Sequence, residues 1–69
     1  MPKPPKRMKP AEIRQIRESL NASQPVFASF LGVSTKAVQA WERGLRGPQR
    51  TALRLLTVAK SNPGILLNG

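Results

Sequence analysis

The sequence predicts an all-α protein, a compact domain of four to five helices that follows a disordered basic tail. Three observations predict this class. Apolar residues recur at helical spacing from residue 11 onward, no run of alternating β-branched residues is present, and glycines and prolines separate the apolar segments. A chain of 69 residues is long enough for one small domain, which buries only about 60% of its unfolded surface.

The first ten residues differ in composition from the rest. They hold four prolines and four cations, with Met1 and Met8 as the apolar side chains. Such a segment neither forms a helix nor buries an apolar face. Residues 1–10 are therefore predicted to be a flexible, polyproline-like tail or linker, and residues 11–67 the folded domain.

Two helices are predicted in the first half of the domain. One covers residues 11–20 and ends at Asn21. The other covers residues 24–31, with Ser23 as its N-cap and Gly32 as a residue of positive φ after its end. Their inward residues are predicted to be Ile13, Ile16, Leu20, Phe27, Ala28 and Leu31.

Two more helices are predicted in the second half. One covers residues 35–43 between Ser34 and Gly44, and the other begins near residue 48 and reaches about Lys60. Their inward residues are predicted to be Val38, Trp41, Ala52, Leu53, Leu56 and Ala59. A fifth helix, of a single turn, is predicted at the apolar residues 65–67 if they are helical.

The residue types that are missing exclude most enzyme classes. The chain has no His, Cys or Asp and only three Glu. It therefore has no ordinary zinc site, no Ser-His-Asp or Cys-His nucleophile and no disulfide framework. Nothing in the spacing of the three glutamates suggests an acid–base pair. We expect no catalytic residues, no metal and no cofactor.

The formal net charge of +9 indicates an anionic partner. Subtracting the four cations of the tail leaves +5 on residues 11–69. Nucleic acid, an acidic protein and an anionic membrane surface all fit such a charge. The membrane is disfavoured because the cations flank a folded motif, and no apolar run approaches the roughly 20 residues of a membrane span. With no secretory signal and no cysteine, we expect a cytoplasmic protein.

Residues 24–43 meet the physical requirements of a helix-turn-helix motif. Only Gly32, Val33 and Ser34 separate two short helices, so the helices must cross steeply. A steep crossing needs a small residue where the backbones approach, and Ala28 supplies it. Four positions later, Gly32 tolerates the positive φ of the turn.

The same segment resembles the XRE family, the phage Cro and repressor-like regulators. The family pattern is matched by Ser23-Gln24, Phe27-Ala28, Leu31-Gly32-Val33-Ser34, Ala37-Val38 and Trp41-Glu42-Arg43-Gly44. Val26 and Phe30 depart from it, since the family usually carries charged surface residues there. The resemblance implies a five-helix, lambda-repressor-like DNA-binding domain whose recognition helix, residues 35–43, enters the major groove.

Candidate DNA contacts follow from the outward positions of this helix and from the resemblance. Those assigned to base edges are Thr35, Lys36, Gln39 and Ala40. Those assigned to phosphates are Gln24, Ser34, Arg43, Arg46, Gln49 and Arg50. In relatives the acid at the position of Glu42 pairs with an arginine of the first helix, which implies a structural Arg17–Glu42 pair.

One recognition helix reads few bases, so we expect a homodimer on a palindromic operator. Apolar residues with no obvious place in the core are Leu45, Leu55, Ile65, Leu66 and Leu67. They fit a small two-fold interface. Completion of the core explains them equally well.

The segment from Leu53 to Leu67 is similar to the late segment of HigA-type and MqsA-type antitoxins from bacterial toxin–antitoxin modules. This implies a bacterial, nucleoid-associated autorepressor that binds a toxin through a segment not evident in this chain. The alternative is a protein-interaction module that neutralises a toxin, with only secondary, non-specific DNA binding.

Overall fold

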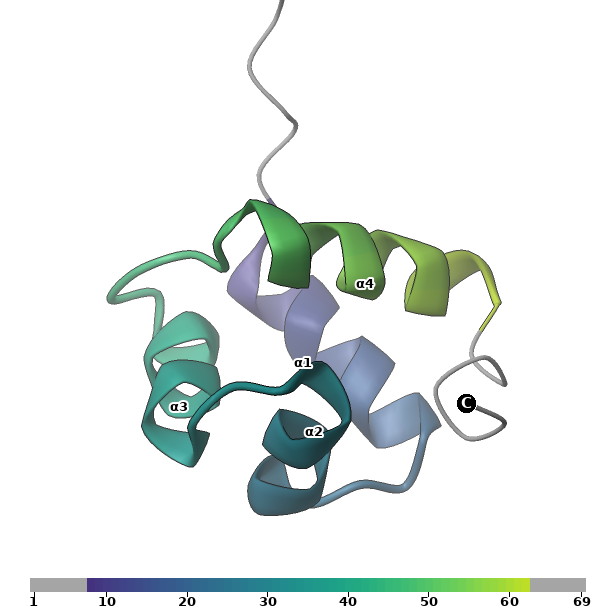
Figure 1. The fold of residues 1–69 in the computed structure, drawn as a ribbon, viewed down its shortest axis with the longest axis horizontal. Coiled ribbons are helices and arrows are strands. Elements are labelled where there is room, and N and C mark those ends of the chain that lie inside the picture. The colour runs from purple at the N-terminus through teal and green to yellow at the C-terminus, as the bar shows by residue number, and fades with distance from the viewer. Residues whose placement is uncertain (1–7, 63–69) are drawn as a thin grey trace, which may run out of the picture.

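The computed structural model describes residues 8–62, and this range contains four helices and no strand (Figure 1). The helices are α1 (Pro10–Ser19), α2 (Gln24–Leu31), α3 (Thr35–Arg43) and α4 (Arg50–Ser61). The all-α prediction is confirmed, and no boundary differs from the predicted one by more than about two residues. The predicted fifth turn at residues 65–67 and most of the predicted tail, residues 1–7, lie outside the described residues.

The helix ends follow from residues that the sequence places at the boundaries. Ser23 and Ser34 cap α2 and α3, because each hydroxyl oxygen accepts a hydrogen bond from the backbone N–H three residues later, at 3.3 and 3.1 Å. Gly32 and Gly44 end the same helices with φ values of 70° and 75°. Asn21 follows α1 with φ 53°, a conformation that asparagine tolerates better than most residues.

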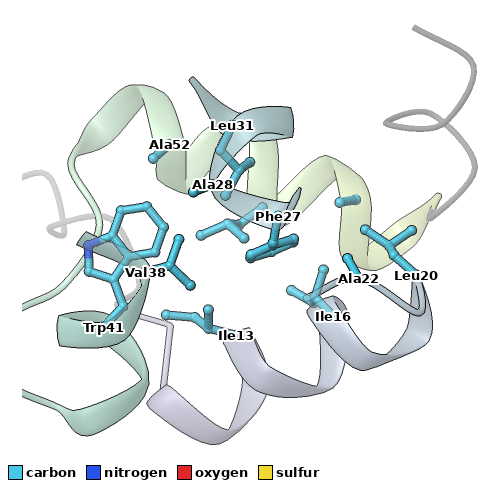
Figure 2. Packing of buried hydrophobic residues seen from close by; sticks show 12 residues of the cluster. Ile13, Ile16, Leu20, Ala22, Phe27, Ala28, Leu31, Val38, Trp41 and Ala52 are labelled. Carbon is cyan, nitrogen blue, oxygen red and sulfur yellow. The ribbon is translucent and has the colours of Figure 1, made fainter. Parts of the chain in front are cut away.

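Side chains from all four helices form one core (Figure 2). Phe27, Ile13, Leu56 and Val38 are its largest fully buried side chains. The other members are smaller or lie nearer the surface, namely Ile16, Leu20, Ala22, Ala28, Leu31, Trp41, Ala52 and Ala59. Burial of this apolar surface provides the main driving force for folding.

Two details differ from the predictions for the core. Leu53 is half-buried, because Ala52, Leu56 and Ala59 occupy the inner face of α4 and Leu53 lies about 100° away from Ala52 around the helix. Met8, in the predicted tail, packs against the core and lies two residues before the start of α1. The folded part therefore begins earlier than residue 11.

The packing leaves one side of α3 free. α3 contacts both α2 and α1, and α4 packs on α1 (Figure 1). Val38 and Trp41 are the apolar side chains by which α3 joins the core. Since these two positions face inward, the opposite face of α3 is available to a partner. Within residues 8–62, no helix has the length and apolar character needed to cross a bilayer.

Candidate nucleic-acid interface

The outward face of α3 carries the residues predicted to read bases. Lys36 is exposed, and Thr35, Gln39 and Ala40 are half-buried. A lysine donates to guanine O6 and N7, a glutamine pairs bidentately with adenine, and threonine adds a hydroxyl and a methyl group. At Ala40 only a methyl contact is available. The four side chains therefore offer donors, acceptors and a methyl group along one short helix.

Predicted phosphate contacts flank this helix at its end. Arg43 closes α3, Arg46 lies in the loop after it, and Gln49 and Arg50 begin α4. All four are exposed. Figure 1 shows that the loop carries the chain from the end of α3 to the start of α4. The four residues thus lie close together in the sequence, between the end of α3 and the first residue of α4.

The predicted Arg17–Glu42 pair is present and links α1 to α3. Arg17 Nε donates to Glu42 Oε2 at 2.7 Å, and Nη2 donates to Oε1 at 3.0 Å. Arg17 Nη1 also donates to the carbonyl oxygen of Ala22 at 3.1 Å. This bidentate geometry fixes both side chains, because an arginine and a carboxylate match each other in a single orientation. The Glu42 side chain is only 3% exposed.

Burial alone would raise the pKa of Glu42, but the partners of its carboxylate lower this pKa by more. The hydrogen bonds and positive charge of Arg17, with further hydrogen bonds from Gln24 and Arg14, hold the pKa below its ordinary value of 4.5. On the other side of the pair, the hydrogen bond to Glu42 raises the pKa of Arg17. The pair is therefore ionised at neutral pH.

Glu42 also brings together two polar side chains at the exposed edge of the pair. Gln24 Nε2, at the first turn of α2, donates to Oε1 at 3.4 Å. Arg14 Nε lies 3.5 Å from the same oxygen, and the Arg14 side chain is 55% exposed. Gln24 was predicted to contact phosphate and Arg14 was missed. The available signal was the i, i+3 spacing of Arg14 and Arg17, which places both on one face of α1.

The remaining predicted residues have mixed positions. The Ser34 hydroxyl oxygen caps α3, which leaves its proton free to donate to a phosphate. Leu45 is 73% exposed. Leu55 is half-buried against the core, which favours completion of the core over an interface. Ile65, Leu66 and Leu67 lie outside the described residues.

The positions of the acids leave the outward side of α3 positive within the described residues. Glu42 is buried in its pair, and Glu12 and Glu18 both lie on α1. Glu12 accepts from Lys60 at 2.8 Å. Along α3 and the loop after it, the exposed charges of the described chain are therefore Lys36, Arg43 and Arg46, which are all positive.

Comparisons with known proteins agree with this geometry. A protein family described as helix-turn-helix matches residues 13–59. The chain is 39% identical over 57 residues to a protein named Antitoxin HigA-2 from Vibrio cholerae serotype O1. The matched region is 83% of this chain, but the chain spans only 55% of that relative's length. The chain belongs to the XRE-type helix-turn-helix family.

Proposed function

We propose that this chain is a sequence-specific DNA-binding transcriptional regulator that binds a palindromic operator as a homodimer. The observation that carries the proposal is the arrangement of α3. Lys36 and Gln39 face outward between the half-buried Thr35 and the arginines at the helix end, with no exposed acid among them. Base-reading groups in the middle and cations beside them are the two components of specific DNA recognition.

The proposed roles divide the interface into two groups. Base edges in the major groove are contacted by Thr35, Lys36, Gln39 and Ala40. Phosphates are contacted by Gln24, Ser34, Arg43, Arg46, Gln49 and Arg50. We add Arg14 to this group, because its half-exposed side chain lies beside Gln24 at Glu42. Arg17 and Glu42 hold α1 against α3 and touch no base. The protein needs no metal or cofactor and performs no catalysis in this proposal.

The similarity to Antitoxin HigA-2 supports a more specific role. We propose an antitoxin-type autorepressor, which acts in the bacterial cytoplasm at the nucleoid and has a cognate toxin as its second partner. Because the chain covers about half of that relative, the toxin contact is assigned to no residue of the described range.

The proposal is tested by selecting bound duplexes from a random pool. Enrichment should yield a palindrome whose half-site centres lie about 34 Å, or roughly 10 base pairs, apart. A single enriched half-site without symmetry would overturn the dimer. Failure to enrich any sequence would overturn specific recognition altogether.

One observation favours the alternative function, a toxin-binding module. α2 carries no charged residue, and Val26 and Phe30 expose 46% and 36% of their surface on it. Their positions, four residues apart, place both side chains on one face of the helix. If selection yields no enriched sequence, this uncharged face becomes the first surface to substitute in assays of toxin binding.

Arg14 gives a prediction specific to the phosphate contacts. Arg14→Ala should weaken binding to operator and scrambled duplex alike, because a phosphate contact carries no sequence information. The slope of log affinity against log salt concentration should become shallower by about 0.9, the value for one lost phosphate contact. Fluorescence anisotropy at four salt concentrations measures this slope.

The matched control is Lys60→Ala, which also removes an exposed cation paired with a glutamate, but from α4 and outside the proposed phosphate contacts. Its slope should stay at the wild-type value. Equal slopes for Arg14→Ala and Lys60→Ala would contradict the assignment of Arg14 to phosphate.

A further inference from the structure

The indole N–H of Trp41 is a donor that residues 8–62 leave unused. The Trp41 side chain belongs to the core, and the residue is only 4% exposed. Figure 2 shows its nitrogen on the edge of the ring that is turned away from the other core side chains. Among residues 8–62, no hydrogen bond is made by this indole N–H. Buried tryptophans usually find an acceptor for this group.

The unused N–H nevertheless reaches the surface. Within the described range, no side-chain nitrogen or oxygen is both fully buried and unpaired. The indole nitrogen therefore keeps contact with solvent, although the ring around it is covered. A partner can reach this edge of Trp41 but not its face, which excludes stacking on a base.

The surface beside Trp41 is hollowed in two places. A hollow of about 360 Å³ lies against the turn of the motif and the start of α4, and a second of about 670 Å³ lies against the start of α1. Both are lined by Trp41, Arg46 and Gly47. The edge of the indole therefore opens beside the loop that carries Arg46.

The other groups at this place are donors as well. Gln49 and Thr51 line the smaller hollow, and no acid lines either one. Gln49 is the N-cap residue of α4, but its side chain makes no capping hydrogen bond, and the first turn of α4 has no acid. The N–H groups of that turn favour a negative charge nearby. Since glutamine and threonine side chains can donate and no acid is present, these groups fit an anion, which accepts hydrogen bonds.

We infer that the indole N–H of Trp41 donates a hydrogen bond to a phosphate oxygen of the DNA backbone, which Arg46 contacts from the loop. The inference rests on the proposed function and deepens it, because it gives a core residue a direct contact with the duplex. Trp41 thus anchors α3 on both sides, with its ring in the core and its N–H on the phosphate. The contact fixes the position of α3 in the groove and carries no sequence information.

The single tryptophan of the chain makes the test direct. A ¹⁵N-labelled sample gives one indole N–H cross-peak, which is followed while the selected duplex is added. We expect the peak to move downfield and its exchange with water to slow as the complex forms. Sodium phosphate alone, added to 50 mM at constant ionic strength, should leave the peak close to its free position. An equal shift with sodium phosphate would indicate a site for free anions and overturn the assignment to DNA.

Affinity provides the second measurement. Trp41→Phe removes the donor and keeps an aromatic ring, and should weaken duplex binding about tenfold, as expected for a hydrogen bond to a charged group. The salt slope should not change, since no charge is lost, whereas Arg46→Ala should make the slope shallower. If the smaller ring impairs folding, a synthetic chain with benzothienylalanine at position 41 keeps the shape of the indole and lacks the N–H.

The outcomes separate this inference from the proposed function. Specific duplex binding with an unmoved indole peak, or with wild-type affinity in the benzothienylalanine chain, would overturn the role of Trp41 alone. Absence of specific binding by the wild-type chain would overturn both.

Discussion

Replacing Lys36 and Gln39 together with alanine is expected to reduce affinity for the operator about 100-fold, while affinity for a scrambled duplex falls far less. Each side chain is assigned one bidentate contact to a base edge, and such contacts discriminate by about 1–3 kcal/mol each. Both residues lie on the outward face of α3, which the core does not use. The fold should therefore persist, as checked by circular dichroism and thermal unfolding.

A matched control removes the same two types of chemical group from positions outside α3. The double variant Gln15→Ala with Lys60→Ala also loses one amide and one cation, both exposed and both outside α3. It should keep the preference for the operator. If the two double variants lose that preference to the same degree, net charge and not base contact governs recognition.

Replacing Glu42 with alanine is expected to destabilise the folded domain by about 3 kcal/mol, because the substitution leaves the largely buried Arg17 without its carboxylate. For a domain of this size such a loss lowers the unfolding midpoint by roughly 10–20 °C. Arg14 and Gln24 lose their shared partner in the same step. Thermal unfolding followed by circular dichroism measures the loss.

Glu18→Ala is the control, since it also removes one acid, but from an exposed position on α1. It should change stability by no more than about 0.5 kcal/mol. Equal stability of the Glu18→Ala and Glu42→Ala variants would contradict a structural role for the buried pair.

The same pair predicts how stability depends on pH. The pKa of Glu42 in the folded state lies below its ordinary value of 4.5. Its contribution is therefore complete above about pH 4.5 and is lost as the pH falls through the folded-state pKa. Between pH 7 and pH 3, the thermal unfolding midpoint of Glu42→Gln should therefore change less than that of the wild type. Identical pH profiles for the two proteins would contradict this linkage.

The helices were predictable because their signals are local. Serine N-caps at Ser23 and Ser34, glycines at positions 32 and 44, and apolar residues at helical spacing depend only on neighbours in the sequence. The turn of the motif was predictable for the same reason. Leu53 was assigned wrongly to the buried face, because spacing alone does not rank the residues along the edge of an apolar stripe.

The side-chain network around Glu42 was predictable only in part. The resemblance implied its pair with Arg17, and the i, i+3 spacing places Arg14 beside Arg17. Nothing in the sequence connects Gln24 to Glu42, which is 18 residues away. Those contacts depend on how α1 and α2 pack against α3. The unused N–H of Trp41 belongs to the same class, since the sequence identifies a core aromatic but not which edge of its ring remains open.

The exposed face of α2 shows another limit. Val26 and Phe30 occupy positions where the family carries charged residues, and they remain exposed in the fold. The residue types at these two positions thus depart from the family pattern, but the positions themselves remain on the surface. The sequence identifies the departure, whereas only the structure shows that the described part of this chain leaves both side chains partly exposed.

The central claim, specific recognition of DNA by α3, is tested most directly by fluorescence anisotropy of the wild-type chain. The selected palindrome and a scrambled duplex of the same composition are titrated at 50 and 200 mM salt. The account predicts tighter binding to the palindrome at both salt concentrations. Both affinities should fall at 200 mM, because the release of counterions from DNA is less favourable at a higher salt concentration. Equal affinity for the two duplexes, vanishing for both at 200 mM salt, would show a basic domain that binds DNA by charge alone.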